Sequence, residues 1–235
     1  MKEDNKLVSV LISVFNAQET ISNSLNSILN QTYKNIEILI MDDCSTDNSF
    51  DILNSFQLDN NKVKIYKNSQ NLGLTKSLNK LVDMCNGDII VRHDIDDYSV
   101  EKRIEKQVKA LSRYKLDFCL ARATRMDTKK PIPRFSFYLP DKFVIKYKNP
   151  FIHGTLAINK DVLLKVGKYD KDFYFAQDYK LFSDLLANGF NYKVLNESLY
   201  YLNMKNNISS INKNEQKYYA KFVQNKTSPK KWKYL

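Results

Sequence analysis

Residues 36–43 read IEILIMDD. Its first six residues form a largely apolar run, typical of a strand buried on both faces, which stops abruptly at two aspartates. Similar runs at residues 7–14, 63–66 and 88–92 predict three further strands. Between these runs apolar residues recur at helical spacing, which predicts helices across residues 21–29, 50–56 and 74–82. Residues 45–47 are expected to cap the second of these helices.

Strands that alternate with helices imply right-handed crossovers and a parallel sheet. We therefore predict an α/β, Rossmann-like fold with a mostly parallel sheet flanked by helices. Ligands of such sheets bind beyond the carboxyl ends of the strands. Two acidic clusters are expected at that edge: Asp42 and Asp43 after the second strand, and DIDD at residues 94–97 after the fourth.

The second half of the chain is less regular in sequence. Helices are predicted at residues 99–113, 161–166 and 177–187, and a strand at residues 118–124. Residues 129–148 hold three prolines and several aromatic residues, which favours a loop or an insertion. Polar residues dominate from position 203 onward, and the chain closes on a basic, aromatic tail.

Size and composition fit one soluble globular domain of 235 residues with a formal net charge of +11. That charge predicts either a polyanionic partner or a general lysine-rich bias, and both interpretations stay open. The three cysteines lack CxxC spacing, so a disulfide framework or zinc site is not predicted. No apolar run is long enough for a membrane span or a signal peptide, and we therefore expect a cytoplasmic protein.

The acidic turn at residues 94–97 needs an explanation, because three carboxylates in four residues repel one another. A solvated acidic loop is one interpretation. A Mn²⁺ or Mg²⁺ ion shared with a diphosphate is the other, since such ions take one or two carboxylates together with substrate phosphates. An ion there would neutralise the charge that develops on a leaving nucleoside diphosphate.

Four segments together carry a family resemblance. They are VSVLISVFNAQETISNSLNSILNQTYKNIEILIMDDCSTDNS, NLGLTKSLNKLVDMCNGDIIVRHDIDD, NPFIHGTLAI and KVGKYDKDFYFAQDYKLF. In this order they resemble successive blocks of the family 2 glycosyltransferases, which are inverting enzymes with the GT-A fold. The resemblance covers roughly residues 7–200. It implies one nucleotide-binding domain at residues 1–200, and the remaining residues 201–235 are expected to form a polar, basic, helical extension.

The resemblance implies a role for each matching residue. Asp94 and Asp96 would form the DxD motif that meets the ribose and the metal ion, and Asp178 would be the general base that deprotonates the acceptor hydroxyl. The residues implied in donor binding are Phe15, Asn16, Glu19, Asp42, Asp43, Asn71, Gly73, Lys76, Asp94 and His153. Simpler interpretations stay open: helix capping for Asp178 and for the Asp42–Asp43 pair, and a structural role for His153.

The implied activity is transfer of a sugar, with UDP as the expected nucleotide, to a hydroxyl of a glycan or a lipid-linked acceptor. Surface polysaccharide, lipooligosaccharide or glycoprotein glycans would be the products. Because no QxxRW motif follows Asp178, a processive synthase is disfavoured. Lysines and aromatic residues interleave in residues 212–235. Such a segment can contact the anionic inner face of the plasma membrane, and a solvated or docked helix is the alternative that stays open.

Three other classes of protein share some of these sequence features with a glycosyltransferase. A nucleotidyltransferase also uses paired aspartates with a metal, but it normally needs a glycine-rich triphosphate loop, and none follows the first strand. A nucleic-acid-binding protein is disfavoured by the acidic strand ends, which repel phosphates. An inactive nucleotide-sugar-binding module stays open.

Overall fold

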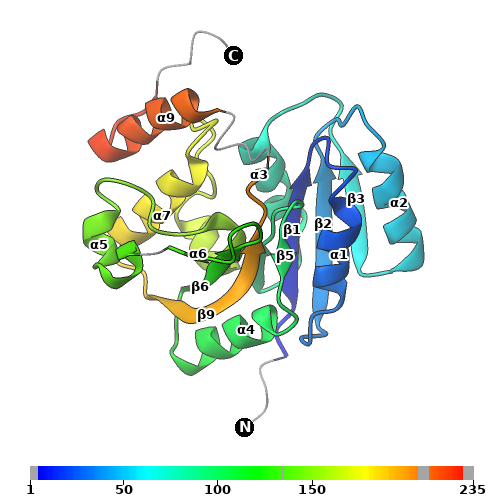
Figure 1. Ribbon diagram of the computed structural model, residues 1–235, viewed down its shortest axis with the longest axis horizontal. Coiled ribbons are helices and arrows are strands. Elements are labelled where there is room, and N and C mark those ends of the chain that lie inside the picture. The colour runs from blue at the N-terminus through cyan, green and yellow to red at the C-terminus, as the bar shows by residue number, and fades with distance from the viewer. Residues whose placement is uncertain (1–4, 134, 206–211, 230–235) are drawn as a thin grey trace.

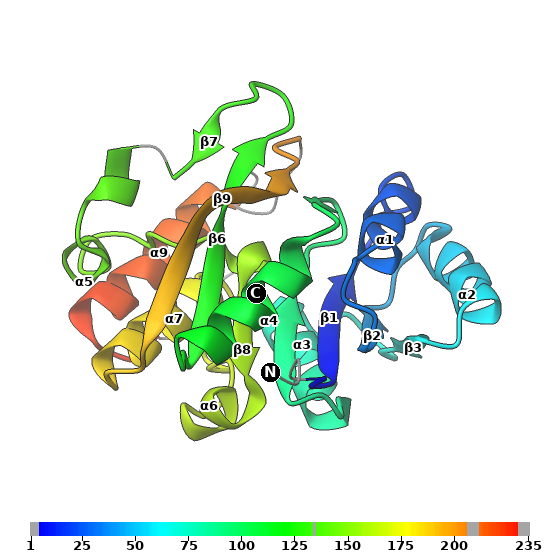
Figure 2. The same ribbon diagram turned by 90° about the horizontal axis from the view of Figure 1, so that it is seen from below.

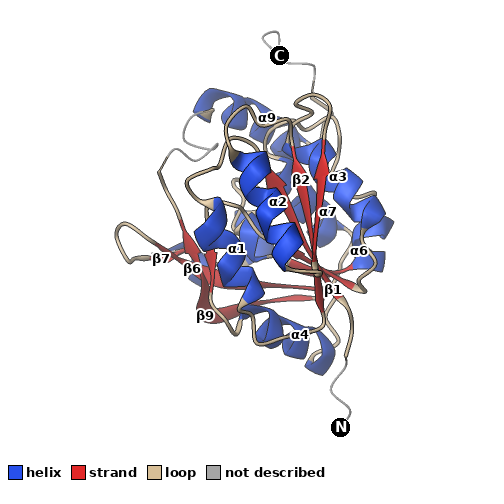
Figure 3. Ribbon diagram, turned by 90° about the vertical axis from the view of Figure 1, so that its right-hand side faces the viewer, coloured by secondary structure: helices blue, strands red, loops and turns tan. Residues whose placement is uncertain are grey.

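One mixed sheet runs through the molecule, with helices on both of its faces (Figures 1 and 3). The computed structural model describes residues 5–133, 135–205 and 212–229. Within these residues the strand order is β3-β2-β1-β4-β8-β6-β9-β5, and β7 pairs with β6 outside this path.

The amino-terminal half has the predicted alternation of strands and helices. β1, β2, β3 and β4 pair in parallel in the order β3-β2-β1-β4. The elements are β1 (Val8–Val14), α1 (Ile21–Leu29), β2 (Ile36–Asp42), α2 (Ser49–Asp59), β3 (Val63–Lys67), α3 (Leu74–Met84) and β4 (Ile89–Arg92). Of the residues predicted to cap α2, Asp47 accepts the Ser49 N–H with Oδ1 at 2.9 Å, but the N-cap position is Asn48, which makes no side-chain cap bond.

Two apolar clusters cover the two faces of the sheet, because side chains alternate along each strand while both faces are buried. The residues of β1 that pack under α1, α2 and α4 are Val8, Val10, Ile12 and Val14. Leu11 of β1, with residues of β2, packs under α3, α6 and α7. Burial on both faces explains why these strands lack the apolar–polar alternation of a half-exposed sheet.

The carboxyl ends of β1 and β4 form the topological switch point of the sheet. The chain moves from β1 outward to β2 and β3, and then crosses back to β4 on the other side of β1. A crevice at such a point is where ligands of open α/β sheets bind. It lies between the loop that starts at Phe15 and the acidic turn at residues 94–97.

The carboxyl-terminal half is more regular than the sequence indicates. Its elements are β5 (Tyr98–Ser99), α4 (Arg103–Arg113), β6 (Phe118–Arg125), β7 (Pro131–Ile132), η1 (Phe135–Tyr138), α5 (Asp141–Val144), η2 (His153–Thr155), β8 (Ala157–Asn159), α6 (Lys160–Lys165), α7 (Gln177–Ala187), β9 (Tyr192–Leu202) and α9 (Lys213–Asn225). β8 and β9 were not predicted, and residues 129–148 are not a simple loop, because they contain β7, η1 and α5.

The helix predicted from residue 99 starts later, at Arg103. Residues 98–99 form β5, which pairs with the end of β9: Tyr98 lies opposite Tyr201, and Ser99 opposite Tyr200. This pairing joins residues that are far apart in the sequence, so local helical periodicity could not reveal it.

β9 is a long strand of 11 residues that lies beside β6 in the carboxyl-terminal half (Figure 2). It runs parallel to β6, with register shifts on both sides of Arg122. These irregularities let its last residues reach β5 beside the acidic turn. As a result, Tyr200 and Tyr201 of β9 lie beside the acidic turn.

The carboxyl-terminal helix α9 packs on α7 through Tyr219 and Val223, in a cluster with Phe173 and Phe175. Of the tail predicted to contact a membrane, residues 230–235 lie outside the described residues. Among the described residues, no helix combines the length and apolar character needed to cross a bilayer.

Candidate active site

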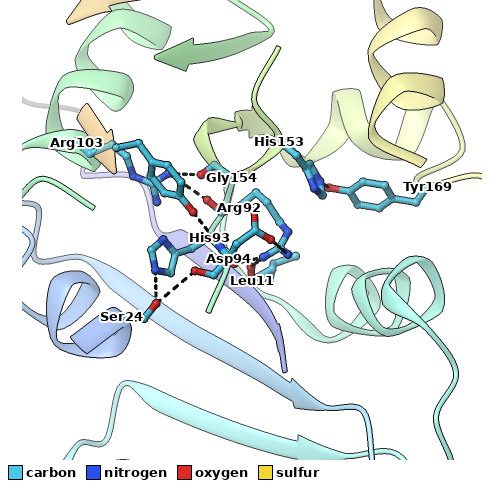
Figure 4. Close-up of polar contacts among 10 residues, drawn as sticks. Leu11, Ser24, Arg92, His93, Asp94, Arg103, His153, Gly154 and Tyr169 are labelled. Carbon is cyan, nitrogen blue, oxygen red and sulfur yellow. Dashed lines mark hydrogen bonds and ion pairs between the residues drawn. The ribbon is translucent and has the colours of Figure 1, made fainter. Parts of the chain in front are cut away.

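The acidic turn at residues 94–97 directly follows β4 and is held from beneath by a buried arginine. Arg92 is 2 % exposed. Its guanidinium donates to the carbonyls of Leu11 and His93 and forms an ion pair with Asp94 (Figure 4). A charged residue at the end of an apolar strand is costly to bury unless it is paired. Arg92 therefore fixes the Asp94 carboxylate at the switch point.

A second buried arginine lies behind the first. Arg103 is fully buried, and its Nη1 donates to the carbonyls of Gly154 at 2.6 Å and Arg92 at 3.1 Å. Its guanidinium lies over the ring of Tyr200, 5.1 Å from the centroid. Within the described part of the chain, Arg103 Nε and Nη2 have no hydrogen-bond partner. Burial lowers the Arg103 pKa to about 10, so the side chain stays charged at neutral pH.

Tyr200 connects β9 to the turn. The Asp94 N–H donates to the Tyr200 hydroxyl at 3.0 Å. Gly154 is packed so tightly here that an added Cβ would collide with the Tyr200 hydroxyl and come within 2.9 Å of Asp94 Oδ2. Only a glycine fits between these two side chains without displacing them.

The two following carboxylates are crowded. Burial, together with the neighbouring Asp94 carboxylate, raises the pKa of Asp96 to about 6 and that of Asp97 to about 9. Asp97 Oδ1 accepts the N–H of Asn203 at 2.7 Å, whereas Asp96 is partly exposed. A raised pKa means that the charged form of a carboxyl group is disfavoured, and a bound cation would relieve this for Asp96.

A cavity of about 420 Å³ opens beside Asp96, on the side of the turn that faces α1. Glu19, Asp96 and Asp97 contribute carboxylates to it, Tyr98 and Tyr201 contribute rings, and Lys129 contributes a cation. Of the predicted donor-binding residues, Glu19 thus lies with the acidic turn and not with Asp42 and Asp43.

Asp43 organises the loop that follows β3. Its carboxylate accepts the Asn68 side-chain amide at 2.7 Å and the N–H groups of Leu72 at 2.9 Å and Gly73 at 2.8 Å. Gly73 has a φ of +83°, and an added Cβ would come within 2.6 Å of the Tyr174 ring. Loop 68–73 is therefore shaped around Asp43, and Tyr174 covers it.

The neighbouring Asp42 is different. Its Oδ2 accepts the Ser45 N–H at 3.2 Å, while the buried Oδ1 has no partner among the described residues. Asp42 is thus the less saturated member of the pair. Neither aspartate is the N-cap of α2, which is Asn48.

The other residues predicted to lie near the nucleotide are found at the same edge of the sheet. Phe15, at the end of β1, is 49 % exposed. Asn16 has a left-handed backbone with φ of 49°, and its Oδ1 accepts the Thr46 N–H at 2.9 Å, so this side chain braces loop 44–48. Asn71 and Lys76 are exposed, and Asn71 Oδ1 accepts the Gly73 N–H at 3.1 Å.

Asp178, the predicted base, lies in the first turn of α7. It makes no N-cap bond: the N-cap residue is Ala176, which has a left-handed backbone and no side-chain cap. Asn149 Nδ2 donates to Asp178 Oδ2 at 2.8 Å. Burial raises the Asp178 pKa, and the Asp94 carboxylate contributes in the same direction, which places the two carboxylates within electrostatic reach.

His153 lies in η2 and contacts Tyr169. Its Nε2 is 2.8 Å from the Tyr169 hydroxyl, and the two side chains point toward one another (Figure 4). Burial, and next the positive charge of Arg92, lower the His153 pKa to about 3. The imidazole is therefore a polar, uncharged group at physiological pH. The other histidine, His93, is fully buried, and Ser24 Oγ lies 2.8 Å from its Nε2.

Sequence reasoning missed several residues that shape the site. A signal existed for Arg92, since it is a charge that ends an otherwise apolar strand. Asn68, Arg103, Asn149, Tyr169 and Tyr200 gave none, because each acts through a partner distant in sequence.

The carboxylates fit a divalent ion that takes few protein ligands. No described group of three or more His, Cys, Asp or Glu side chains forms a ready-made metal site. Asp94 and Asp96 can instead offer one or two carboxylates beside phosphate oxygens, which is how Mg²⁺ is usually held. Burial, and next the Asp94 carboxylate, raise the pKa of Asp96, and a cation bound there would counter both effects.

Comparison with known proteins identifies relatives of the whole chain. The O-antigen biosynthesis glycosyltransferase WbnJ of Escherichia coli is 31 % identical over 222 residues, covering 91 % of this chain and 85 % of that protein. The E. coli protein WfaP, named as a UDP-Glc:alpha-D-GlcNAc-diphosphoundecaprenol beta-1,3-glucosyltransferase, is 28 % identical over 196 residues, which is 78 % of this chain and 72 % of that protein.

Solved structures show the same fold. TarS 1-349 of Staphylococcus aureus in complex with UDP-GlcNAc superposes with a TM-score of 0.73 at 20 % identity, over 85 % of this chain and 59 % of that one. The mannosyltransferase PcManGT of Pyrobaculum calidifontis, in complex with GDP-Man and Mn²⁺, gives 0.74 at 17 % identity, over 94 % and 65 %. The chain thus has the predicted GT-A fold and spans less than two thirds of these two solved chains.

The family model for "Glycosyl transferase family 2" matches residues 9–167, which include β1, the Asp42–Asp43 pair, the acidic turn and His153. The sequence resemblance, the fold and the convergence of carboxylates at the switch point lead to one result: the chain belongs to glycosyl transferase family 2.

Proposed function

We propose that this protein is an inverting, non-processive hexosyltransferase that moves a sugar from a nucleoside diphosphate, UDP above all, to a hydroxyl group. The observation that carries the proposal is the arrangement of Asp178. This carboxylate accepts a hydrogen bond from the Asn149 amide, and the charge of Asp94 contributes to raising its pKa, which supports a place for Asp178 near the acidic turn. Relatives support the choice of donor, since TarS was solved with UDP-GlcNAc and WfaP is named for UDP-Glc.

In the proposed reaction the acceptor hydroxyl oxygen attacks the anomeric carbon from the face opposite the diphosphate. Asp178 accepts the hydroxyl proton as the new glycosidic bond forms, and the bond to the diphosphate oxygen breaks. Burial raises the Asp178 pKa toward the range where a carboxylate is an effective base. The Asn149 amide donates to Oδ2 and thereby leaves Oδ1 to receive the proton.

Donor binding is proposed for the loops around β1, β2 and β4. Asp43 holds loop 68–73 in shape, so that Gly73 and the exposed Asn71 and Lys76 flank the base and the diphosphate. Phe15 offers an exposed ring on which a base can stack. Asp94 and Asp96 would hold a Mn²⁺ or Mg²⁺ ion, which would supply charge neutralisation on the leaving diphosphate.

The proposed acceptor is a glycan or lipid-linked sugar, at the cytoplasmic side of the membrane, for surface polysaccharide or related glycan synthesis. WbnJ and WfaP, named for O-antigen synthesis and for a diphosphoundecaprenol-linked acceptor, support this class. A membrane contact through residues 212–235 stays a prediction from the sequence.

A thermal-shift screen tests the donor assignment. UDP, GDP, UDP-Glc, UDP-GlcNAc and GDP-Man would each be added with Mn²⁺ and with EDTA, and a ligand at 100 times its Kd should stabilise the protein by about 2.7 kcal/mol. Asp43→Asn is expected to reduce this shift, because loop 68–73 loses a charged acceptor for two N–H groups. Failure of every nucleotide to shift the transition would contradict the proposal.

A further inference from the structure

The segment between β7 and η2 carries an unusual surface. Four of its large apolar side chains are exposed: Tyr138 by 76 %, Leu139 by 52 %, Phe143 by 54 % and Tyr147 by 64 %. Three lysines stand among them, Lys142, Lys146 and Lys148, and all three are exposed. These seven residues are called the 138–148 surface below. Scattered exposed apolar residues are normal, but four within ten positions indicate an interaction site.

The charge of this surface is one-sided. None of its three lysines forms an ion pair with a residue in the described ranges. The one acidic residue in the segment, Asp141, accepts the Tyr192 hydroxyl at 3.0 Å, and burial raises its pKa. The lysines are therefore left without a nearby solvent-facing counter-charge in the segment.

Neighbouring α9 adds positive charge to the same end of the molecule. Figures 1 and 2 both place α5 and α9 at the end opposite α2, and Gln224 Nε2 of α9 donates to the Tyr147 carbonyl at 2.6 Å. Lys213, Lys217 and Lys221 are exposed along α9 at four-residue spacing. Buried contacts hold the segment in place, because the Tyr179 hydroxyl donates to the Ile145 carbonyl at 2.6 Å.

We infer that the 138–148 surface docks on an anionic lipid bilayer. Aromatic residues prefer the bilayer interface, and lysines are attracted by the negative surface potential of anionic lipids. A second copy of this chain fits less well, since two lysine-rich surfaces repel one another. The uncompensated lysines are what select an anionic partner over a neutral apolar one.

The 138–148 surface lies next in the chain to a residue that contacts the proposed base. Residue 149 follows it directly, and Asn149 donates to Asp178. A bilayer held at residues 138–148 would therefore lie on the acceptor side of the crevice, where a lipid-linked sugar could reach the base. This last step rests on the proposed function, whereas the docking does not.

Flotation of the full chain with vesicles tests the docking. Wild-type protein should float with phosphatidylcholine vesicles that contain phosphatidylglycerol, and not with phosphatidylcholine alone, and added salt should release it. The variant Lys142→Gln with Lys146→Gln and Lys148→Gln should lower the partition coefficient at least about tenfold. Leu139→Gln with Phe143→Gln should lower it as well, because these side chains lie in the bilayer interface.

Control variants remove the same charge, and one exposed apolar side chain, elsewhere on the molecule. Lys6, Lys102 and Lys171 are exposed, so their joint change to Gln alters net charge equally, and Leu58→Gln removes an apolar side chain that is 87 % exposed. These controls should float almost as wild type does, with unfolding temperatures near wild type for every variant. Equal loss in variant and control would overturn the inference.

Two other outcomes would also overturn it. One is flotation that is abolished by deleting residues 227–235 but kept in the 138–148 variants, since the tail would then be the anchor. The other is self-association, detected by sedimentation equilibrium, that Phe143→Gln abolishes, since the occupant would then be a second copy. None of these readouts uses sugar transfer, so failure of the docking is distinguishable from failure of the proposed function.

Discussion

The two ends of the parallel sheet handle buried charge in opposite ways. At the amino end, Glu37 at the start of β2 accepts the Ser9 hydroxyl and the Asn86 N–H, both at 2.6 Å, and Lys64 Nζ at 3.0 Å. Burial raises its pKa, but these hydrogen bonds outweigh that effect and lower the pKa to about 2. This carboxylate is saturated by the protein itself.

At the carboxyl end the polar groups are incompletely satisfied. Asp42 Oδ1, Arg92 Nε and two nitrogens of Arg103 are buried without a partner among the described residues, and the pKa of Asp96 is raised to about 6. Natural proteins accept such unsatisfied groups chiefly at functional sites. The amino end of the sheet thus satisfies its buried charge within the protein, whereas the carboxyl end leaves buried polar atoms without a partner among the described residues.

The strongest test of this contrast is Asp178→Asn. The amide keeps the shape of the side chain but cannot accept a proton at neutral pH, so the transfer rate should fall by about 10²–10⁴. Affinity for the nucleotide, measured by calorimetry, should change little. Asp161→Asn, at an exposed position, is the control. Equal loss of nucleotide affinity and activity would place Asp178 in the donor site and not at the acceptor.

Asp96→Asn should separate activity from stability. Removing one of the crowded carboxylates relieves repulsion, so the free energy of unfolding should stay the same or rise, while transfer should fall on the order of 10²-fold through loss of a charged ligand. Urea unfolding and a Mn²⁺ titration of activity measure the two effects. If the Asp96→Asn variant transferred sugar in EDTA at the wild-type rate, Asp96 would not be a metal ligand.

Glu37→Gln should show the reverse pattern. The neutral amide loses the charge that four donors stabilise, which should cost about 1.5–3 kcal/mol at pH 7. Transfer by the folded fraction should be unchanged. Because the folded-state pKa lies below the unfolded value of 4.5, the carboxylate stabilises above that pH and loses this effect as pH falls toward 2. Wild type and variant should therefore converge in urea unfolding as the pH is lowered from 5 to 3.

Two glycines give the smallest and most local comparison. An added Cβ at Gly87 would come within 2.6 Å of the Ser9 backbone nitrogen, whereas one at Gly154 would meet the Tyr200 hydroxyl and Asp94. Gly87→Ala should cost about 1–3 kcal/mol in stability, with normal activity when folded. Gly154→Ala should displace Asp94. We expect a clear fall in kcat with a small change in Tm. The same pattern in both variants would remove the distinction between the two ends.

Much of the fold could be predicted, because its signals are local. The runs ending at Val14, Asp42 and Arg92 are apolar on both faces and short, which is what strands of a doubly covered parallel sheet require. β9 could not be predicted, because its burial alternates irregularly and its partners β6 and β5 are distant in sequence.

The candidate site divides in the same way. Aspartates directly after strands mark the edge where ligands bind, so Asp42, Asp43, Asp94 and Asp96 could be named from their place in the chain. What each carboxylate does there depends on its partners. Nothing in the local sequence indicated that Asp43 would hold loop 68–73 or that Arg92 would pair with Asp94.

The sequence by itself determined the α/β alternation, the acidic edge of the sheet and the family, because strand periodicity and motif order are properties of neighbouring residues. Only the tertiary structure decided that Asn149 meets Asp178, that Tyr200 and Gly154 enclose Asp94, and that the 138–148 surface faces outward. Each of these depends on contacts between distant segments, and their closeness is set by how the β6–β9 half folds back onto the β1–β4 half.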